Sequence, residues 1–316
     1  MPGFKNIFNL FIYKFFTLTY ALTFGLVILL IIRAISPFFL IRLAQLKNTK
    51  IGHYIVNTEL YLCEKEKKIN IPKVKFLDLF YLTPRKSDCN SQLTKMWKRK
   101  IRILPWQFLR VIDILNKLIP GGAQHNINNL HGKSWDTKNL LDIDNKNLYF
   151  TQDEKEQGKN FLKKIGLSEN NKFVCLLVRD EAYDKAVEDK KNQNNYHSYR
   201  NCDVSDFIKA CNYLTEKGFY VFRMGKTVNK SLNINNKRVI DYANNGMRSD
   251  FLDIYLGAHC SFWISTGTGI DALAQVFRIP SVFTNETPLL GIRTGQPNSI
   301  FTIKKLFDRK INKKMS

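Results

Sequence analysis

The sequence lacks the short motifs that mark the commonest metal and nucleophile chemistry of enzymes. It contains no Cys-x-x-Cys pair and no His-Glu-x-x-His, so neither zinc-finger nor zincin spacing is present. A Gly-x-Ser-x-Gly turn, a Walker A loop and a two-metal carboxylate cluster are also missing. We therefore expect no cofactor and no metal site.

Cysteine is sparse, with six residues that are well separated along the chain. None of them forms a close pair, and three lie in apolar segments, so a disulfide framework is not expected. The pattern is typical of reduced, buried thiols in a protein that faces the cytosol.

Acidic residues are few relative to basic ones. The 316 residues include 49 Lys and Arg but only 27 Asp and Glu, which gives a formal net charge of +22. Such a charge attracts nucleic acid, anionic lipid or phosphorylated small molecules. No zinc-finger spacing or RNA-recognition aromatic pattern accompanies it, so we expect no nucleic-acid partner. Nucleic-acid binding driven by net charge alone is the alternative.

One long uncharged run, Phe15–Ile32, lies near the N-terminus. Its eighteen residues are at the lower limit of the length that spans a bilayer. No Ala-x-Ala-like cleavage site follows it, which favours an uncleaved anchor over a signal peptide. We expect residues 1–40 to form a membrane anchor, with a helix that lies in the membrane interface as the alternative.

Basic residues flank this run unequally. They are Lys5 and Lys14 before the run, and Arg33, Arg42, Lys47 and Lys50 after it. Because positively charged flanks stay on the cytoplasmic side of a membrane, this imbalance predicts that the main body faces the cytoplasm.

Residues 41–150 alternate between strand-like and helical patterns. Val74–Leu82 is a strongly apolar run typical of a strand, and Phe108–Ile119 has helical spacing that Pro120 ends. The polar, asparagine-rich stretch 123–150 is typical of a linker and surface loop. We expect residues 41–150 to form a first α/β domain together with this linker.

Residues 151–316 predict a second α/β domain. A capping box at Thr151–Glu154 begins a helix that Gly166 ends. Phe173–Val178 is a continuous apolar run typical of a buried parallel strand, and helical and strand patterns alternate after it. The expected fold class is α/β, with two Rossmann-like domains behind an N-terminal membrane-anchor helix.

The stretch Ser261–Thr284 organises the second domain, because it predicts a strand, a glycine-rich turn, a helix and another strand. The turn consists of Ser265, Thr266, Gly267, Thr268 and Gly269. It would present backbone N–H groups and the positive end of a helix dipole, an arrangement suited to phosphate. The alternative is that the glycines only make a tight turn between strand and helix.

Polar side chains gather where the strands of this domain end. They are Arg179, Asp180, His197, Arg200 and Arg248. A guanidinium can bind phosphate oxygens in a bidentate way, so several arginines near a glycine turn predict a diphosphate site. The alternative is that each arginine is a surface residue. No Gly-x-Gly-x-x-Gly follows Phe173–Val178, which argues against a dinucleotide site.

Several segments together resemble one protein family. They are Ile51-Gly52-His53 with Asn57-Thr58-Glu59, the runs 176–180 and 221–225, Tyr199–Asp203 and Ser261–Phe283. The set is similar to a family of bacterial glycosyltransferases found among surface-polysaccharide genes, and the likeness covers most of the chain after residue 40. The run His197–Asp203 is distantly similar to the H-x-R-x-x-D signature of GT-B fucosyltransferases, with the spacing changed by one residue.

The resemblance implies a GT-B arrangement of two domains, a nucleotide-diphosphate sugar donor and a membrane-associated glycan or lipid-linked acceptor. It also implies a location at the bacterial inner membrane. The diphosphate would lie against the glycine turn, with Arg200 and Arg248 neutralising its charge without a metal ion. Glu286 would bind ribose hydroxyls.

In a glycosyltransferase of this kind, His53 would be the catalytic base. This residue is expected at the end of the first strand, facing the cleft between the domains, where it would deprotonate the acceptor hydroxyl. Asp180 or Glu181 could take this role instead, and His53 could be purely structural. A non-catalytic, membrane-associated glycan- or lipid-binding protein is the alternative function.

Overall fold

The computed structural model describes residues 19–84, 88–127, 136–142, 146–187, 195–288, 292, 296, 298–305, 307–308 and 310–314. The chain divides into two compact units. Unit 1 comprises Met1–Cys89 and Trp97–Ser134, and unit 2 comprises Asn90–Met96 and Trp135–Ser316. The exchange of residues 90–96 into unit 2 was not expected from the sequence.

Unit 1 contains a three-stranded parallel sheet in the order β1-β2-β3. The strands are β1 (Phe39–Leu46), β2 (Lys75–Leu82) and β3 (Arg102–Ile103). The helices are α2 (Leu26–Ala34), preceded by a π-helical turn Ala21–Gly25, then α3 (Ile51–Glu66) and α5 (Trp106–Leu118), with a short 3-10 turn Ala123–His125. Helix α4 (Ser91–Lys98) runs across the boundary between the two units.

The core of unit 1 includes part of the segment that was expected to be an anchor. Leu29 and Ile32 of α2 are buried against Leu43 of β1, Tyr81 of β2 and Ile112 of α5. Helix α2 is therefore part of the α/β unit. Among the described residues no helix is both long and apolar enough to cross a bilayer. The first part of the expected anchor, residues 1–18, lies outside the described residues.

A buried ion pair fixes β1 to β2 in unit 1. The Arg42 guanidinium donates from Nε to Asp78 Oδ1 at 2.7 Å and from Nη2 to Oδ2 at 2.8 Å. The Tyr61 hydroxyl donates to the same carboxylate at 2.5 Å. Burial and this carboxylate raise the pKa of Tyr61 far above its ordinary value. The three side chains satisfy one another, which lets charged groups lie inside the unit.

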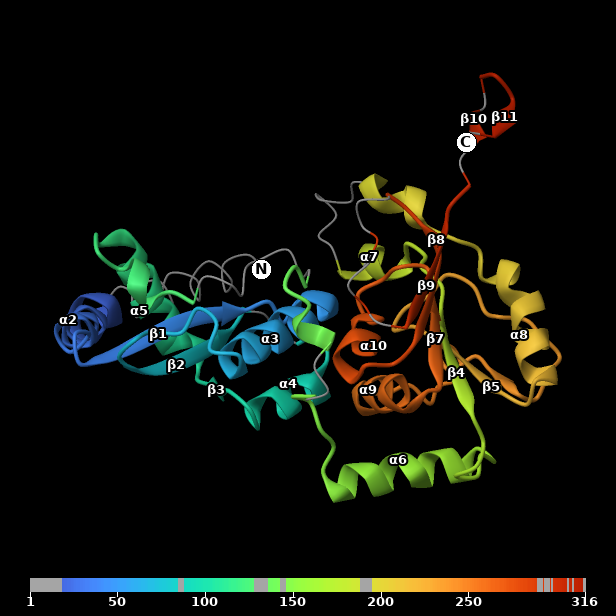
Figure 1. The fold of residues 1–316 in the computed structure, drawn as a ribbon, viewed down its shortest axis with the longest axis horizontal. Helices are drawn as coiled ribbons and strands as arrows, with labels where there is room; N and C mark the ends of the chain where they lie inside the picture. The colour runs from blue at the N-terminus through green and yellow to red at the C-terminus, as the bar shows by residue number, and fades with distance from the viewer. Residues whose placement is uncertain are drawn as a thin grey trace, which may run out of the picture. The chain divides into compact units, whose positions relative to one another are not determined.

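Unit 2 contains a six-stranded parallel sheet in the order β6-β5-β4-β7-β8-β9 (Figure 1). The strands are β4 (Phe173–Leu177), β5 (Tyr220–Met224), β6 (Val239–Ile240), β7 (Phe262–Ser265), β8 (Ser281–Glu286) and β9 (Ser299–Ile303). The chain builds outward from β4 to β6, then crosses back to place β7 on the other side of β4. This confirms a doubly wound sheet whose strand order reverses between β4 and β7.

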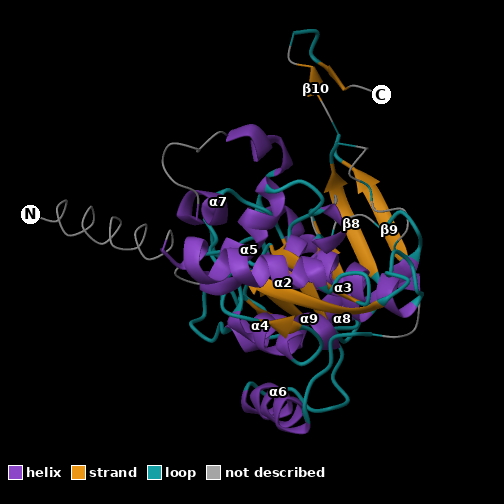
Figure 2. Cartoon of the chain, turned by 90° about the vertical axis from the view of Figure 1, so that its left-hand side faces the viewer, coloured by secondary structure: helices purple, strands orange, loops and turns teal. Residues whose placement is uncertain are grey.

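Helices cover both faces of this sheet. They are α6 (Gln152–Lys164), α7 (Ala182–Val187), α8 (Ile208–Glu216), α9 (Asp250–His259) and α10 (Ala272–Phe277). Shorter 3-10 segments are Leu140–Asp142, Asn195–Arg200 and Val204–Phe207. Strand β9 pairs with β8 and forms one edge of the sheet (Figure 2). Strands β10 (Phe307–Asp308) and β11 (Lys313–Lys314) form a separate antiparallel pair.

Successive side chains of β4 point to opposite faces of the sheet, and both faces are covered. Val174 and Leu176 belong to the apolar cluster that α8 joins through Cys211. The alternate residue Cys175 points to the other face, where its thiol contacts the Leu256 carbonyl of α9. Since every residue of β4 is buried, its continuous apolar sequence is what a central parallel strand requires.

The capping box expected at the start of α6 is confirmed. Glu154 N–H donates to Thr151 Oγ1, and Thr151 N–H donates back to Glu154 Oε2 at 2.9 Å. The expectation that Ile51–His53 ends a strand is wrong, because these residues form the first turn of α3. The first strand lies earlier, at β1, shortly after the apolar run Phe15–Ile32.

Candidate functional site

The carboxyl ends of β4 and β7 meet at the point where the strand order reverses. The Arg179 N–H donates to the Thr266 hydroxyl at 2.7 Å, and the Thr266 N–H donates to the Leu177 carbonyl at 3.1 Å. These two bonds hold the start of the glycine turn against the end of β4. In doubly wound sheets this position is where ligands bind.

The glycine turn is braced from within. The Thr268 N–H and the Ser265 hydroxyl both donate to Asp271 Oδ2, at 2.8 and 2.7 Å. The Gly267 N–H donates to Ser265 Oγ at 3.1 Å. Two N–H groups that the sequence pattern offered to a phosphate are therefore already bonded inside the turn. Helix α10 begins only at Ala272, so Asp271 precedes the helix and is a fully buried brace of the turn.

Arg200 reaches this turn from the 3-10 segment Asn195–Arg200. Its Nη2 donates to the Gly267 carbonyl at 2.5 Å. Gly267 has a positive φ of 76°, and a Cβ built there would lie 2.6 Å from Glu286 Oε1 and 3.3 Å from Arg200 Nη2. Glycine suits this position, because L side chains rarely adopt this backbone conformation and a methyl group here would displace the Glu286 carboxylate.

The charges around Arg200 are mixed but close together. Burial lowers the pKa of the Arg200 guanidinium, and the positive charge of Arg179 lowers it further. Glu286, Asp271 and Tyr199 act in the opposite direction. An anion bound between two guanidiniums that repel each other would stabilise both of them. The structure therefore brings together five of the expected site residues within unit 2, namely Arg179, Arg200, Thr266, Gly267 and Glu286.

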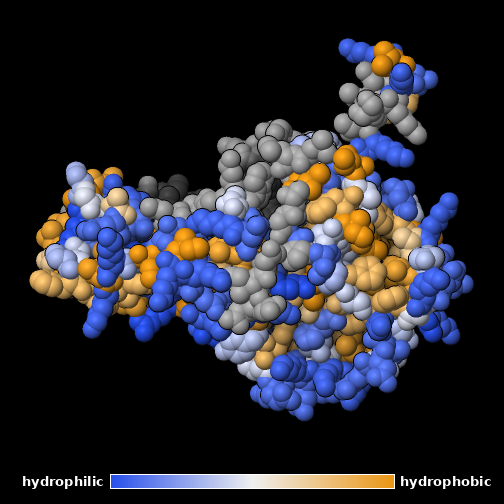
Figure 3. Space-filling model, viewed as in Figure 1, coloured by the Kyte–Doolittle hydropathy of each residue, from blue (hydrophilic) through white to orange (hydrophobic). Residues whose placement is uncertain are grey.

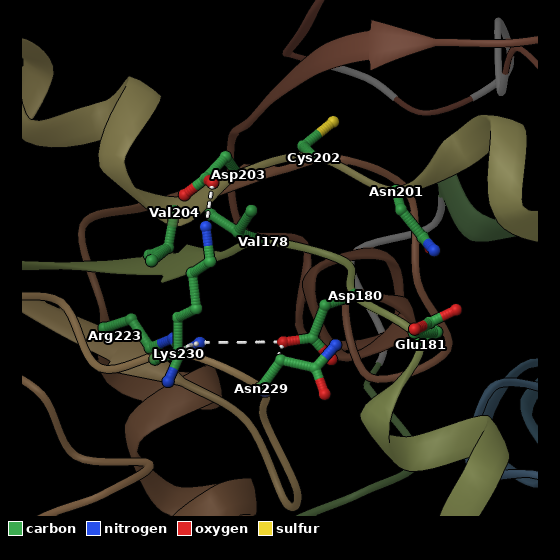
Figure 4. Close-up of a pocket in the computed structure, with 10 residues that line it drawn as sticks. All are labelled: Val178, Asp180, Glu181, Asn201, Cys202, Asp203, Val204, Arg223, Asn229 and Lys230. Atoms are coloured by element: carbon green, nitrogen blue, oxygen red, sulfur yellow. Dashed lines mark hydrogen bonds and ion pairs between the residues drawn. The ribbon is translucent and has the colours of Figure 1, made fainter.

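A cavity of about 180 Å³ lies beside the ends of β4 and β5 (Figure 4). It is lined by Val178, Asp180, Glu181, Asn201, Cys202, Asp203, Val204, Arg223, Asn229 and Lys230. Asp180 accepts hydrogen bonds from the Ala182 N–H at 2.9 Å and the Asn229 N–H at 2.8 Å. Its Oδ2 also lies 4.0 Å from Arg223 Nη2. Asp180 therefore positions two loops at the rim of this cavity.

Lys230 closes another side of the same cavity. Its Nζ donates to Asp203 Oδ2 at 2.5 Å, as the dashed line in Figure 4 shows. This bond and those from Ser205 lower the pKa of Asp203 to about 2. The carboxylate is therefore ionised throughout the physiological pH range.

Arg248 is engaged elsewhere in unit 2. Its Nη2 lies 2.6 Å from Asp253 Oδ2 and 3.0 Å from Asp250 Oδ1, at the start of α9. Burial raises the pKa of Asp253 to about 6, against the opposing effect of Arg248. The expectation that Arg248 neutralises a ligand is not supported by this arrangement, because its guanidinium already bridges two carboxylates.

Comparison with solved structures finds the same fold in two glycosyltransferases. E. coli ADP-heptose LPS heptosyltransferase II has a TM-score of 0.51 at 10% identity, over 84% of this chain and 91% of that one. A glycosyl transferase family 9 protein of Veillonella parvula has a TM-score of 0.52 at 10% identity, over 83% and 85%. At this identity the likeness shows a shared fold alone. No protein-family model and no curated protein sequence matches the chain.

The two expected histidines stand in different situations. His53 lies in the first turn of α3 in unit 1, half-buried. Burial lowers its pKa, and the positive charges of Lys47 and Lys50 lower it further, so its ring is neutral at pH 7. His197 lies in the 3-10 segment Asn195–Arg200, where the structure describes its backbone but not its side chain.

Three residues with a part in this region were not foreseen. Asp271 braces the glycine turn, and Asn229 and Lys230 complete the cavity from a loop after β5. An acidic residue two positions after a glycine run is a signal that could have found Asp271. The loop offers no comparable pattern. Within the described part of the chain, no three His, Cys, Asp or Glu side chains are grouped so that they could hold a metal ion.

Proposed function

We propose that this protein is a glycosyltransferase that moves a sugar from a nucleotide-diphosphate donor to a glycan or lipid-linked acceptor. The observation that carries the proposal is the meeting of Arg179, Arg200 and the Gly267 turn where the strand order reverses. The fold shared with two glycosyltransferases supports the same reaction class, as an analogy at the level of fold.

The donor diphosphate would lie against the two guanidiniums rather than on the turn's N–H groups. When the acceptor hydroxyl attacks the anomeric carbon, the bond between this carbon and the phosphate oxygen breaks. Negative charge then develops on the leaving diphosphate, and Arg179 and Arg200 would stabilise it. In this proposal the two cations do this work without a metal ion.

Hydroxyl groups of the donor would be bound by carboxylates near the same edge of the sheet. Glu286, at the end of β8, points its Oε1 toward Gly267 and could accept from a sugar or ribose hydroxyl. Asp180 at the rim of the cavity is a second acceptor of the same kind. Because Asp180 already holds two N–H groups, we assign it to positioning and binding rather than to proton transfer.

We propose His53 as the base that removes the acceptor proton. A neutral imidazole is the form that can accept a proton, and the lowered pKa of His53 keeps it in this form at pH 7. If His53 is the base, His53→Ala should reduce turnover and leave the affinity for the donor unchanged.

The donor panel can begin with ADP-sugars, since the E. coli fold neighbour is named as an ADP-heptose transferase. The purified full chain would be heated with ADP-, UDP-, GDP- and CDP-sugars, and release of the nucleoside diphosphate would be followed with lipid-linked glycans as acceptors. We expect one nucleotide class to raise the Tm of wild-type protein and of Arg238→Ala, but not of Arg200→Ala. Failure of every nucleotide to raise the Tm would contradict the proposal. Binding without turnover would favour the non-catalytic glycan- or lipid-binding alternative.

A further inference from the structure

Helix α2 is apolar on its exposed side as well as on its buried side. Leu29 and Ile32 pack into unit 1, as described above. On the opposite side Val27, Leu30 and Ile31 of α2, and Phe24 of the π-helical turn before it, are each more than half exposed, from 53% to 65%. These positions recur at helical spacing, so they form one continuous stripe. An ordinary surface helix would carry polar residues there.

Helix α5 runs beside α2 and extends this stripe. The Tyr20 ring lies 5.6 Å from the Phe108 ring, and a Cβ on Gly25 would lie 3.3 Å from Val111 and Leu115. Further along, Arg33 Nη2 donates to the Ile119 carbonyl at 2.8 Å. The two helices are therefore parallel neighbours, and Gly25 lets them approach closely.

The exposed apolar residues of α5 add to those of α2. Phe108 is 54% exposed and Leu118 is 73% exposed. We call the joint surface the α2–α5 face, and define it by Phe24, Val27, Leu30, Ile31, Phe108 and Leu118. Figure 3 shows orange side chains gathered over α2 and α5 at the left end of the view. Contiguous exposed apolar surface of this kind marks an interaction site.

The stretches of sequence that contain α2 and α5 hold few acidic residues. No acidic residue precedes Glu59 in the sequence, and Asp113 is the only one between Asp88 and Asp136. Asp113 is buried, where it accepts from the Tyr81 hydroxyl at 2.6 Å and from Lys117 Nζ at 2.7 Å. The exposed charged side chains of the stretch that contains α5 are thus basic. They include Lys98, Lys100, Arg102 and Lys117.

We propose that the α2–α5 face docks on the surface of a bilayer that contains anionic lipid. Its six apolar side chains enter the boundary between headgroups and acyl chains, with α2 in the plane of the membrane. Basic side chains nearby contact the anionic headgroups. A second copy of the chain fits this face poorly, because each copy carries a net charge of +22. The proposal rests on unit 1 alone and is independent of the proposed enzymatic activity.

The test is flotation of the full chain with vesicles at fixed ionic strength. One set of vesicles contains phosphatidylglycerol and phosphatidylcholine, and the other contains phosphatidylcholine only. The variant combines Leu30→Glu with Leu118→Glu, which places two carboxylates in the face. Its matched control combines Tyr213→Glu with Ile300→Glu, two exposed apolar residues of unit 2. Circular dichroism and the Tm establish that each variant is folded.

We expect wild-type protein and the control to float with the anionic vesicles and to bind the neutral vesicles more weakly. The Leu30→Glu, Leu118→Glu variant should bind the anionic vesicles at least about tenfold more weakly, because two apolar side chains no longer enter the lipid. Equal binding by this variant and wild type would overturn the proposal, as would an absence of wild-type binding. A wild-type dimer that this variant converts to a monomer without vesicles would overturn it in favour of a second copy.

Discussion

The Arg200 guanidinium donates a hydrogen bond of 2.5 Å to the carbonyl oxygen of Gly267. This bond joins the segment before η7 (Val204–Phe207) to the turn after β7, two parts of the chain that are 67 residues apart. It also holds the Arg200 guanidinium close enough to Arg179 for the repulsion between them to lower the pKa of Arg200, in addition to the larger effect of burial. A ligand anion would relieve this repulsion, and the proposed donor site depends on it.

Gly267→Ala tests the crowding at this turn. The new methyl group would meet Glu286 and Arg200 and would sit on a backbone with positive φ. We expect the free energy of unfolding to fall by about 2–4 kcal/mol, from the strained conformation and the displaced side chains together. Nucleotide binding should be lost as well. Urea unfolding and thermal shift measure the two effects.

The matched control is Gly246→Ala. Gly246 has nearly the same φ, 77°, but a Cβ there would meet no atom within 4 Å. This variant carries the backbone strain alone, about 1 kcal/mol, and should bind nucleotide normally. Equal effects of the two substitutions would show that Glu286 and Arg200 do not crowd Gly267.

Arg248→Ala is expected to affect stability but not ligand binding. The substitution leaves the carboxylates of Asp253 and Asp250 without their cation, and Asp253 is almost fully buried. Because Arg248 is partly exposed, we expect the free energy of unfolding to fall by about 1–3 kcal/mol, less than for a fully buried ion pair. Calorimetry gives the Tm, and titration with nucleotide gives the affinity. A large loss of affinity with an unchanged Tm would restore Arg248 to the donor site.

Asp253 predicts a specific dependence of stability on pH. Its folded-state pKa of about 6 is raised above the ordinary value near 4, chiefly by burial. Between pH 4 and 6 the folded chain therefore binds a proton that the unfolded chain does not. The contribution of Asp253 to stability then grows as the pH falls from 7 through 6, by up to about 3 kcal/mol.

The measurement compares the Tm of wild type and Asp253→Asn at pH 7.5 and pH 5. Other carboxyl groups titrate in both proteins, so only the difference between them reports on Asp253. We expect wild type to gain stability relative to Asp253→Asn at pH 5. A difference in Tm that stays constant between the two pH values would contradict the raised pKa.

The buried pair of Arg42 and Asp78 predicts a large effect in unit 1. Asp78→Ala would leave the Arg42 guanidinium and the Tyr61 hydroxyl buried without their acceptor. We expect unit 1 to lose about 3–5 kcal/mol of unfolding free energy. Lys230→Ala, which breaks the exposed pair with Asp203 in unit 2, should leave the Tm nearly unchanged. Equal decreases in unfolding free energy for Asp78→Ala and Lys230→Ala would show that burial does not make the Arg42–Asp78 pair more important for stability.

Sequence patterns predicted the parts of the fold that local signals specify. The apolar run at β4 and the capping box of α6 each carry their own evidence, and both are confirmed. The strand, turn, helix and strand expected at Ser261–Thr284 are confirmed as β7, the glycine turn, α10 and β8. These elements could be read because period, caps and glycine positions act over a few residues.

Other features depend on contacts between distant residues. Nothing local distinguishes Leu29 and Ile32, which pack in unit 1, from the apolar residues of a membrane span. The pairing of Arg248 with Asp253 and Asp250 likewise gives an expected ligand residue partners that no local pattern predicts. The bond from the Thr268 N–H to Asp271 removes a donor that the glycine pattern had offered. In each case a tertiary partner decides the role.

The central claim is that the Arg179 and Arg200 guanidiniums beside the Gly267 turn bind a nucleoside diphosphate, and calorimetric titration tests it most directly. ADP, UDP, GDP and CDP would each be titrated into wild type, Arg200→Ala and Arg238→Ala. We predict saturable one-to-one binding of at least one nucleotide to wild type and Arg238→Ala. Arg200→Ala should bind it at least about tenfold more weakly, as expected for loss of a charged hydrogen bond worth about 1.5–3 kcal/mol. Equal affinity of Arg200→Ala and wild type would contradict the account.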